Sequence, residues 1–122
     1  MKFYKCKHCG NTFAVLYDSG VTPNCCGDAM ELLAAGTSDG AKEKHVPVIE
    51  RNGNAVTVRV GSEPHPMTPE HHIEWIAIVY GVNFQIVRLD PEASEARADF
   101  VVGSDEPITA YEHCNLHGLW KA

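Results

Sequence analysis

Long apolar runs are missing from this chain of 122 residues, as are the hydrophobic core of a signal peptide and any lipidation motif. We therefore expect a soluble, cytoplasmic protein that does not bind membranes. Basic charge is also scarce, because ten lysines and arginines face sixteen aspartates and glutamates, which gives a formal net charge of −6. An acidic chain without a basic stripe is not expected to bind nucleic acid.

Helical periodicity and internal repeats are missing too. Instead, short apolar stretches alternate with turn residues, and Asn52-Gly53 between two alternating runs is a strong hairpin signal. About seven short strands with regularly spaced turns predict an antiparallel β-sandwich of immunoglobulin-like type. The expected strands are 46–50, 55–60, 73–80, 83–89, 97–102, 108–112 and 119–120.

The small polar stretch 34–41 is typical of a linker, so we divide the chain into domains 1–36 and 37–122. The first domain is balanced in charge, and the whole excess of −6 lies in the second. A module of this size buries too little apolar surface to fold without a metal or covalent staple. We therefore predict an all-β protein with a small, metal-stapled N-terminal module.

Four of the five cysteines lie in the first 26 residues, which favours metal binding in a reducing compartment over disulfides. Cys6-x-x-Cys9-Gly10 is a metal knuckle, and Cys25 and Cys26 form a second, adjacent pair. Neighbouring side chains share a metal only in a turn, which should distort the tetrahedron. The spacing leaves zinc and iron open, and His8 is expected to be a solvated knuckle residue.

A second candidate site combines one thiol with imidazoles in the larger domain. Cys114 and His117 stand three positions apart, and three further histidines fall in predicted loops. Since a sandwich gathers its loops at two ends, we expect all five residues to meet on one metal. Such a donor set suits iron, copper or zinc, and we favour a single iron. The five candidates are His45, His65, His71, Cys114 and His117, while His72 and His113 are expected to be solvated.

Glu43 and Lys44 immediately precede His45. If the segment is extended, Glu43 and His45 lie on one side and the carboxylate can cap an open metal position. Lys44 then faces away, unless the segment bends and brings its ammonium group beside that position.

These motifs together resemble the desulfoferrodoxins, the two-iron superoxide reductases, over essentially the whole chain. The matching segments are Cys6-x-x-Cys9 with Cys25-Cys26, Glu43-Lys44-His45-Val46-Pro47, His65-Pro66-Met67 with His71, and Cys114-Asn115-Leu116-His117-Gly118-Leu119-Trp120.

The resemblance implies two mononuclear non-haem irons per chain. The four N-terminal cysteines would hold a rubredoxin-like iron, and the four histidines would surround a second iron with Cys114 as axial ligand. Glu43 would occupy the sixth position in the ferric state and leave it in the ferrous state, and Lys44 would supply local positive charge. The reaction would be one-electron reduction of superoxide to hydrogen peroxide without release of dioxygen.

The resemblance also implies rubredoxin as the electron donor and a homodimer as the assembly. Exposed Phe3, Tyr4 and Leu16 on the small module would favour pairing with a second copy. The first iron could relay electrons or be purely structural.

Two other functions fit parts of the pattern. A cupredoxin-like electron carrier is also a β-sandwich with a late Cys-x-x-His, but it normally has a weak axial methionine after that histidine, and only Met67 is a candidate here. A zinc-bearing interaction module would use the same ligands without redox chemistry.

Overall fold

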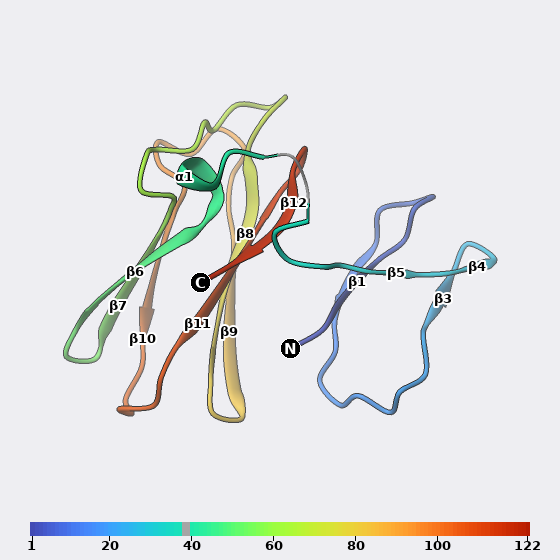
Figure 1. Ribbon diagram of the computed structural model, residues 1–122, viewed down its shortest axis with the longest axis horizontal. Coiled ribbons are helices and arrows are strands. Elements are labelled where there is room, and N and C mark those ends of the chain that lie inside the picture. The colour runs from blue at the N-terminus through green and yellow to red at the C-terminus, as the bar shows by residue number, and fades with distance from the viewer. Residues whose placement is uncertain (38–39) are drawn as a thin grey trace. The chain divides into compact units, whose positions relative to one another are not determined.

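The computed structural model describes residues 1–37 and 40–122 and divides into two compact units, Met1–Ala34 and Ala35–Ala122 (Figure 1). Residues 38 and 39 of the predicted linker lie outside the described residues. Within the described chain no helix is long and apolar enough to cross a membrane.

The N-terminal unit contains two small antiparallel sheets. One has the strand order β2-β1-β5 and the other pairs β3 with β4. Its small core is formed by Tyr4, Cys6 and Met30. Phe3 and Tyr4 are 1% and 6% exposed, so the expectation that they lie at the surface is wrong, whereas Leu16 is 69% exposed. The strands are β1 (Phe3–Lys5), β2 (Thr12–Ala14), β3 (Asn24–Cys25), β4 (Asp28–Ala29) and β5 (Glu31–Leu32).

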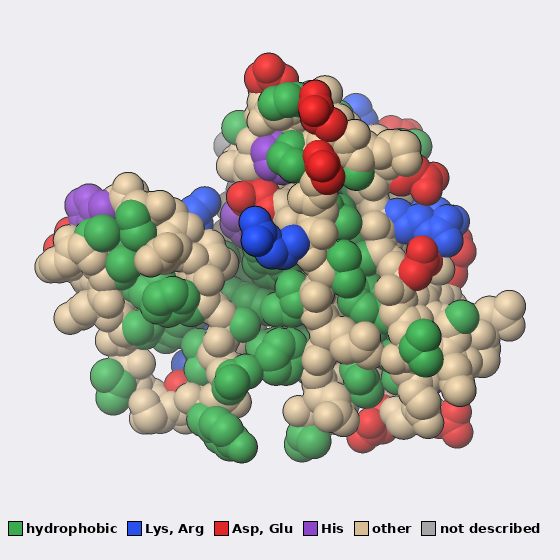
Figure 2. Space-filling model, turned by 180° about the vertical axis from the view of Figure 1, so that it is seen from behind, with side chains coloured by type: hydrophobic (Ala, Val, Ile, Leu, Met, Phe, Trp, Pro, Cys, Tyr) green, Lys and Arg blue, Asp and Glu red, His purple; other side chains and the backbone are tan. Residues whose placement is uncertain are grey.

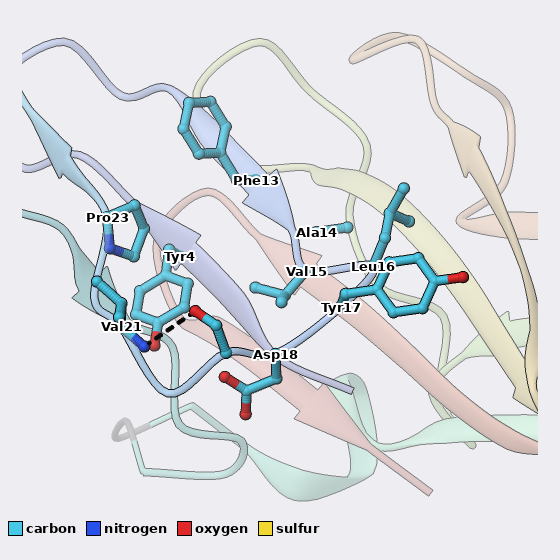
Figure 3. Close-up of a pocket in the computed structure, with 10 residues that line it drawn as sticks. Tyr4, Phe13, Ala14, Val15, Leu16, Tyr17, Asp18, Val21 and Pro23 are labelled. Atoms are coloured by element: carbon cyan, nitrogen blue, oxygen red, sulfur yellow. Dashed lines mark hydrogen bonds between the residues drawn. The ribbon is translucent and has the colours of Figure 1, made fainter.

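An open apolar pocket of about 360 Å³ lies beside this core. Figure 3 shows the side chains around it, among them Phe13, Leu16 and Tyr17, which follow one another along a single segment of the chain. Tyr17 and Val21 are 95% and 75% exposed, so the pocket is bordered by apolar surface in contact with solvent.

The larger unit is the predicted antiparallel β-sandwich, with sheets of order β10-β7-β6 and β12-β11-β8-β9 (Figure 1). Asn52-Gly53 forms the turn between the first two strands, with Gly53 at φ 61°, and Gly81 at φ 58° joins β8 to β9. The elements are α1 (Lys42–His45), β6 (Pro47–Asn52), β7 (Ala55–Val60), β8 (Ile73–Tyr80), β9 (Asn83–Arg88), β10 (Arg97–Val101), β11 (Thr109–Cys114) and β12 (Gly118–Lys121).

Apolar side chains of both sheets fill the space between them. On β7 the valines at 56, 58 and 60 point inward, while Thr57 and Arg59 are only partly buried. Ile76 and Ile78 of the facing sheet are fully buried, and Cys114 belongs to the same cluster. Figure 2 shows acidic side chains at both ends of one face of the sandwich, in keeping with the negative charge of this unit.

Two local expectations differ from the structure. The segment before β6 is one helical turn, α1, rather than an extended approach, and this supplies the bend that was the alternative for Lys44. Cys114 is the last residue of β11 rather than a loop residue, because the ladder with β8 continues, with a register shift, as far as Ile73.

Candidate metal centres

Four imidazole rings form a square at one end of the sandwich. Adjacent rings have centroids 4.8 Å (His45–His65), 4.6 Å (His65–His71), 5.2 Å (His71–His117) and 4.8 Å (His117–His45) apart. These pairs are inclined by 72° to 85°, whereas the diagonal pair His45–His71 is 6.4 Å apart and inclined by only 30°. Helix α1, the segment between β7 and β8, and the turn before β12 thus bring the four predicted histidines together.

The ring nitrogens at the centre of the square lie so close together that their lone pairs would repel one another. Their spacing is, however, the spacing expected of ligands to one metal ion. Nε2 of His45 lies 3.3 Å from Nε2 of His65 and 3.1 Å from Nδ1 of His117. Metal–nitrogen bonds of about 2.1 Å at right angles place two nitrogens about 3.0 Å apart. The donor spacing therefore fits a transition-metal ion.

The outer nitrogens of two rings are held by backbone carbonyls. Nδ1 of His45 lies 2.7 Å from the Ala41 oxygen, and Nδ1 of His65 lies 2.7 Å from the Pro66 oxygen. Since each Nδ1–H donates to its carbonyl, each Nε2 presents a lone pair to the centre. Among the described residues, the buried Nε2 of His71 has no hydrogen-bond partner, so its lone pair is available to an ion.

Burial favours the neutral form of His45, His65 and His71, which is the form that binds metals. It lowers the pKa of His45 and His71 below the ordinary value and that of His65 to about 4. The positive charge of Lys44 adds to the lowering of the pKa for both His45 and His71, and Glu43 acts on His45 in the opposite direction.

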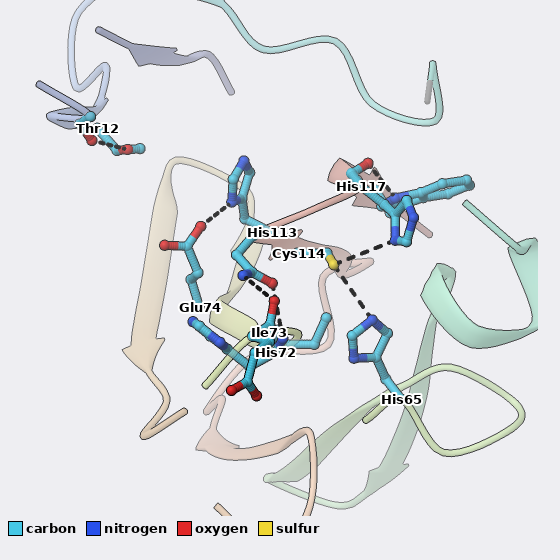
Figure 4. Close-up of polar contacts among 12 residues, drawn as sticks. Thr12, His65, His72, Ile73, Glu74, His113, Cys114 and His117 are labelled. Carbon is cyan, nitrogen blue, oxygen red and sulfur yellow. Dashed lines mark hydrogen bonds and ion pairs between the residues drawn. The ribbon is translucent and has the colours of Figure 1, made fainter. Parts of the chain in front are cut away.

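The thiol of Cys114 lies against the same group. Its Sγ is 3.5 Å from Nε2 of His65 and 3.8 Å from Nδ1 of His117 (Figure 4). One ligand atom from each of four residues lies within 4.8 Å of the others, namely His45, His65, His71 and Cys114. Burial raises the pKa of the thiol, and backbone N–H groups of Leu116 and His117 oppose that rise. A thiolate at this depth needs a neighbouring cation.

Trp120 contacts two of the candidate ligands, a role that the sequence analysis did not assign. Its indole lies nearly parallel to the His45 ring, and its Nε1–H donates to the His117 carbonyl at 3.1 Å. The sequence did carry a signal, since Trp120 follows His117 by three residues across the tight turn at Gly118.

Glu112 and His113, next to Cys114, are buried as well. The expectation that His113 is solvated is wrong, because it is 3% exposed and Nδ1 lies 2.7 Å from Oε1 of Glu74 (Figure 4). Glu112 is fully buried, and within the described residues neither of its carboxylate oxygens has a hydrogen-bond partner. Burial raises its pKa to about 9. His72 is partly buried and Nδ1 lies 2.9 Å from the Thr68 carbonyl.

The N-terminal unit holds the second group, which we call the four-cysteine site. The sulfurs of Cys6, Cys9, Cys25 and Cys26 all lie within 4.8 Å of one another. Cys26 has φ 52° and Gly27 has φ 80°, and this turn lets the adjacent pair face one centre. His8 is exposed and lies 2.5 Å from Asp28.

Backbone N–H groups also point at these sulfurs. Donors from Cys9 and His8 lower the pKa of Cys6 to about 6, whereas hydrogen bonding with the neighbouring sulfurs, Cys9 first, raises that of Cys26 to about 12. Several thiols therefore resist simultaneous ionisation unless a cation offsets their mutual repulsion, as in a tetrahedral site with four thiolate ligands.

The cupredoxin alternative needs a methionine on the metal. Met67 instead packs against the hydrophobic core, and its Sδ accepts a hydrogen bond from the Ile73 N–H at 3.4 Å. Four converging imidazoles also exceed the two of a blue-copper site.

The chain matches the family described as "Desulfoferrodoxin" over residues 37–122 and "Desulfoferrodoxin, N-terminal domain" over residues 1–33. It is 50% identical to a desulfoferrodoxin of Nitratidesulfovibrio vulgaris, covering 99% of this chain and 94% of that protein. It is 45% identical to a desulfoferrodoxin homolog of Archaeoglobus fulgidus, covering 100% and 96%.

Solved structures give the same picture. The superoxide reductase from Treponema pallidum superposes with a TM-score of 0.82 at 34% identity and covers 99% of this chain and 97% of that one. A one-iron superoxide reductase from Giardia intestinalis covers 66% of this chain and 96% of its own, with a TM-score of 0.59 and 33% identity.

Proposed function

Since the chain belongs to the desulfoferrodoxin family, we propose that it is a superoxide reductase, converting superoxide, one electron and two protons into hydrogen peroxide without releasing dioxygen. The observation that carries this proposal is the square of four imidazoles with one thiol against it.

We assign iron to both groups of ligands. His45, His65, His71, His117 and Cys114 would hold the catalytic iron, and Cys6, Cys9, Cys25 and Cys26 would hold the other. An iron ion held by these residues would supply the electron, and the thiolate of Cys114 would increase its reducing power. The donor spacing and the raised pKa of Cys114 support a metal ion at the histidine site, because a cation is needed to keep the thiol ionised.

Lys44 is assigned to the capture of superoxide. The substrate is an anion and the chain carries a net charge of −6, so local positive charge must oppose the overall field. The influence of Lys44 on the pKa of both His45 and His71 supports its place beside the ring of histidines. From there its ammonium group can hold the water that delivers a proton.

We assign to Glu43 the role of closing the histidine site with its carboxylate after the reaction. It lies in the same helical turn as His45, and its negative charge acts on that ring. A carboxylate that closes the open face would help displace peroxide and would keep other ligands away from it.

We further propose that rubredoxin donates the electrons and that the protein is a homodimer. The apolar pocket bordered by Leu16, Tyr17 and Val21 supports pairing, because it leaves apolar surface for a second copy to cover. Five free cysteines fit a reducing compartment, and on that ground we place the protein in the cytoplasm.

The test is a superoxide assay that measures both products on iron-loaded, pre-reduced protein. Reduction yields one peroxide for each superoxide and no dioxygen, whereas dismutation yields both products in equal amounts. Metal analysis on the same sample should find two irons per chain. Two zincs per chain, or dioxygen equal to peroxide, would reject the proposal.

A further inference from the structure

The turn formed by residues 60–65 carries one candidate ligand and contacts the segment that carries another. It is closed on itself by two backbone hydrogen bonds, from the Gly61 N–H to the Glu63 oxygen at 3.3 Å and from the His65 N–H to the Val60 oxygen at 3.1 Å. It follows β7 directly and ends at His65, so its shape fixes where that histidine enters the square of imidazoles.

The same turn also forms hydrogen bonds with the backbone of α1. The carbonyl oxygen of Glu43 accepts hydrogen bonds from the Glu63 N–H at 2.9 Å and from Oγ of Ser62 at 3.2 Å. A carbonyl that receives two donors has both lone pairs occupied and is held in direction as well as in position.

Gly61 makes this contact possible. A Cβ at Gly61 would lie 2.7 Å from the Glu43 oxygen, 2.9 Å from the carbonyl carbon of Lys44 and 3.0 Å from the His45 nitrogen. All three atoms belong to the backbone, so a side chain there would push the helical turn away rather than displace a flexible group.

The side chains of Glu43 and Lys44 are exposed, and within residues 1–37 and 40–122 neither forms a hydrogen bond or a salt bridge. Among the described residues, no hydrogen bond or salt bridge of these two side chains therefore fixes their position. Their position follows from the backbone of α1, which in turn rests on the 60–65 turn.

We propose that Gly61 and Ser62 are positioning residues for superoxide reduction, which hold the Glu43 carbonyl and thereby set where the Glu43 carboxylate and the Lys44 ammonium stand at the open face. This rests on the function proposed above for Glu43 and Lys44. Neither Gly61 nor Ser62 touches the reacting atoms, and both act through the backbone of α1.

The experiment compares Ser62→Ala and Gly61→Ala with two matched controls, all as full-length, iron-loaded protein. Ser94→Ala removes a hydroxyl from an exposed loop, and Gly103→Ala adds a methyl group where no atom lies within 4 Å of the new Cβ. Three quantities are measured: hydrogen exchange of the Glu63 amide, iron content, and the second-order rate constant for superoxide at several ionic strengths.

Ser62→Ala should speed exchange of the Glu63 amide about fivefold, as expected for the loss of one hydrogen bond. Gly61→Ala should speed it more and lower the rate constant about tenfold, with a changed dependence on ionic strength because the charge of Lys44 has moved. Both controls should match the wild type. Wild-type exchange together with a wild-type rate constant and salt dependence in Gly61→Ala would overturn the proposal. Failure of the proposed function would appear separately, as missing peroxide from the wild type, while the exchange measurement still reports on the turn.

Discussion

The indole ring of Trp120 stacks on the imidazole of His45, with ring centroids 5.1 Å apart and planes inclined by 29°. The same indole donates its Nε1–H to the carbonyl of His117. One buried side chain thus orients two residues of the histidine square, which are adjacent in space but lie near opposite ends of the sequence of the larger unit.

Replacing Trp120 by Leu should weaken metal binding at the histidine site about tenfold, because partners that orient metal ligands typically contribute that much to affinity. Phe in its place retains the stacking and should lose less. Affinity is measured by chelator competition, with the four-cysteine site as internal reference. Trp75→Phe, which alters the ring stacked on His113 at 5.6 Å, is the control. Equal losses in Trp75→Phe and Trp120→Leu would contradict a specific role for Trp120.

Replacing Cys114 by Ser should abolish peroxide formation from superoxide and leave the absorption of the four-cysteine site intact. A serine hydroxyl does not ionise at neutral pH and cannot act as a soft anionic ligand. Cys26→Ser should instead change the absorption of the four-cysteine site and leave peroxide formation intact, because it removes a sulfur from that site. Undiminished peroxide yield in Cys114→Ser would refute the assignment of Cys114 as a ligand.

Replacing Lys44 by Ala should lower the second-order rate constant for superoxide about three- to tenfold and flatten its dependence on ionic strength, without loss of iron. Stopped-flow kinetics over a range of salt concentrations measures both effects. Lys42→Ala removes the same charge from the same helical turn and serves as control. If the two variants behave alike, only net charge matters and Lys44 has no specific place in the reaction.

Replacing Glu112 by Met should stabilise the protein by about 1–2 kcal/mol, because a buried carboxyl group without a partner carries a desolvation cost that an apolar side chain of similar length avoids. Urea unfolding at neutral pH gives the free energy of unfolding. Glu92→Met, at an exposed position, is the control for the same substitution at the surface. Loss of stability in Glu112→Met would mean that the carboxyl group makes a favourable contact inside the sandwich.

Replacing Asp99 by Asn should reduce the sensitivity of the fold to acid. Hydrogen bonds from Thr57 and Arg97 lower the pKa of Asp99, so its contribution to stability is present at neutral pH. It is lost as the pH falls from about 4 through the lowered pKa of the folded state. The variant should therefore show a shallower fall of Tm between about pH 5 and pH 3. Asp105→Asn is the control for the loss of one exposed carboxylate, and parallel curves for Asp99→Asn and the wild type would contradict the prediction.

The regular part of the fold was predictable because its signals are local. Alternating side chains specified β7 to the residue, an almost continuous apolar run specified β8, and Asn52-Gly53 specified the hairpin between β6 and β7. The histidines were expected to converge because loops of a sandwich meet at its ends.

The remaining features depend on contacts that local signals do not encode. A helix of four residues such as α1 is too short to show a period. The burial of His113 depends on strands paired across 39 residues, which bring it to Glu74. The role of Gly61 depends on the close approach of a second backbone, which the residue type alone does not indicate. The burial of Glu112 could have been predicted, because it shares its face of β11 with Ala110 and Cys114.

The histidine square joins segments that are far apart in the sequence and are therefore synthesised at different times. Its first member, His45, precedes β6, whereas Cys114 ends β11 and His117 lies in the turn before β12. The cluster of four cysteines, by contrast, is fully synthesised by residue 26. The small module can therefore bind its metal while the sandwich is still being translated, but the histidine site can bind its ion only after His117 has emerged.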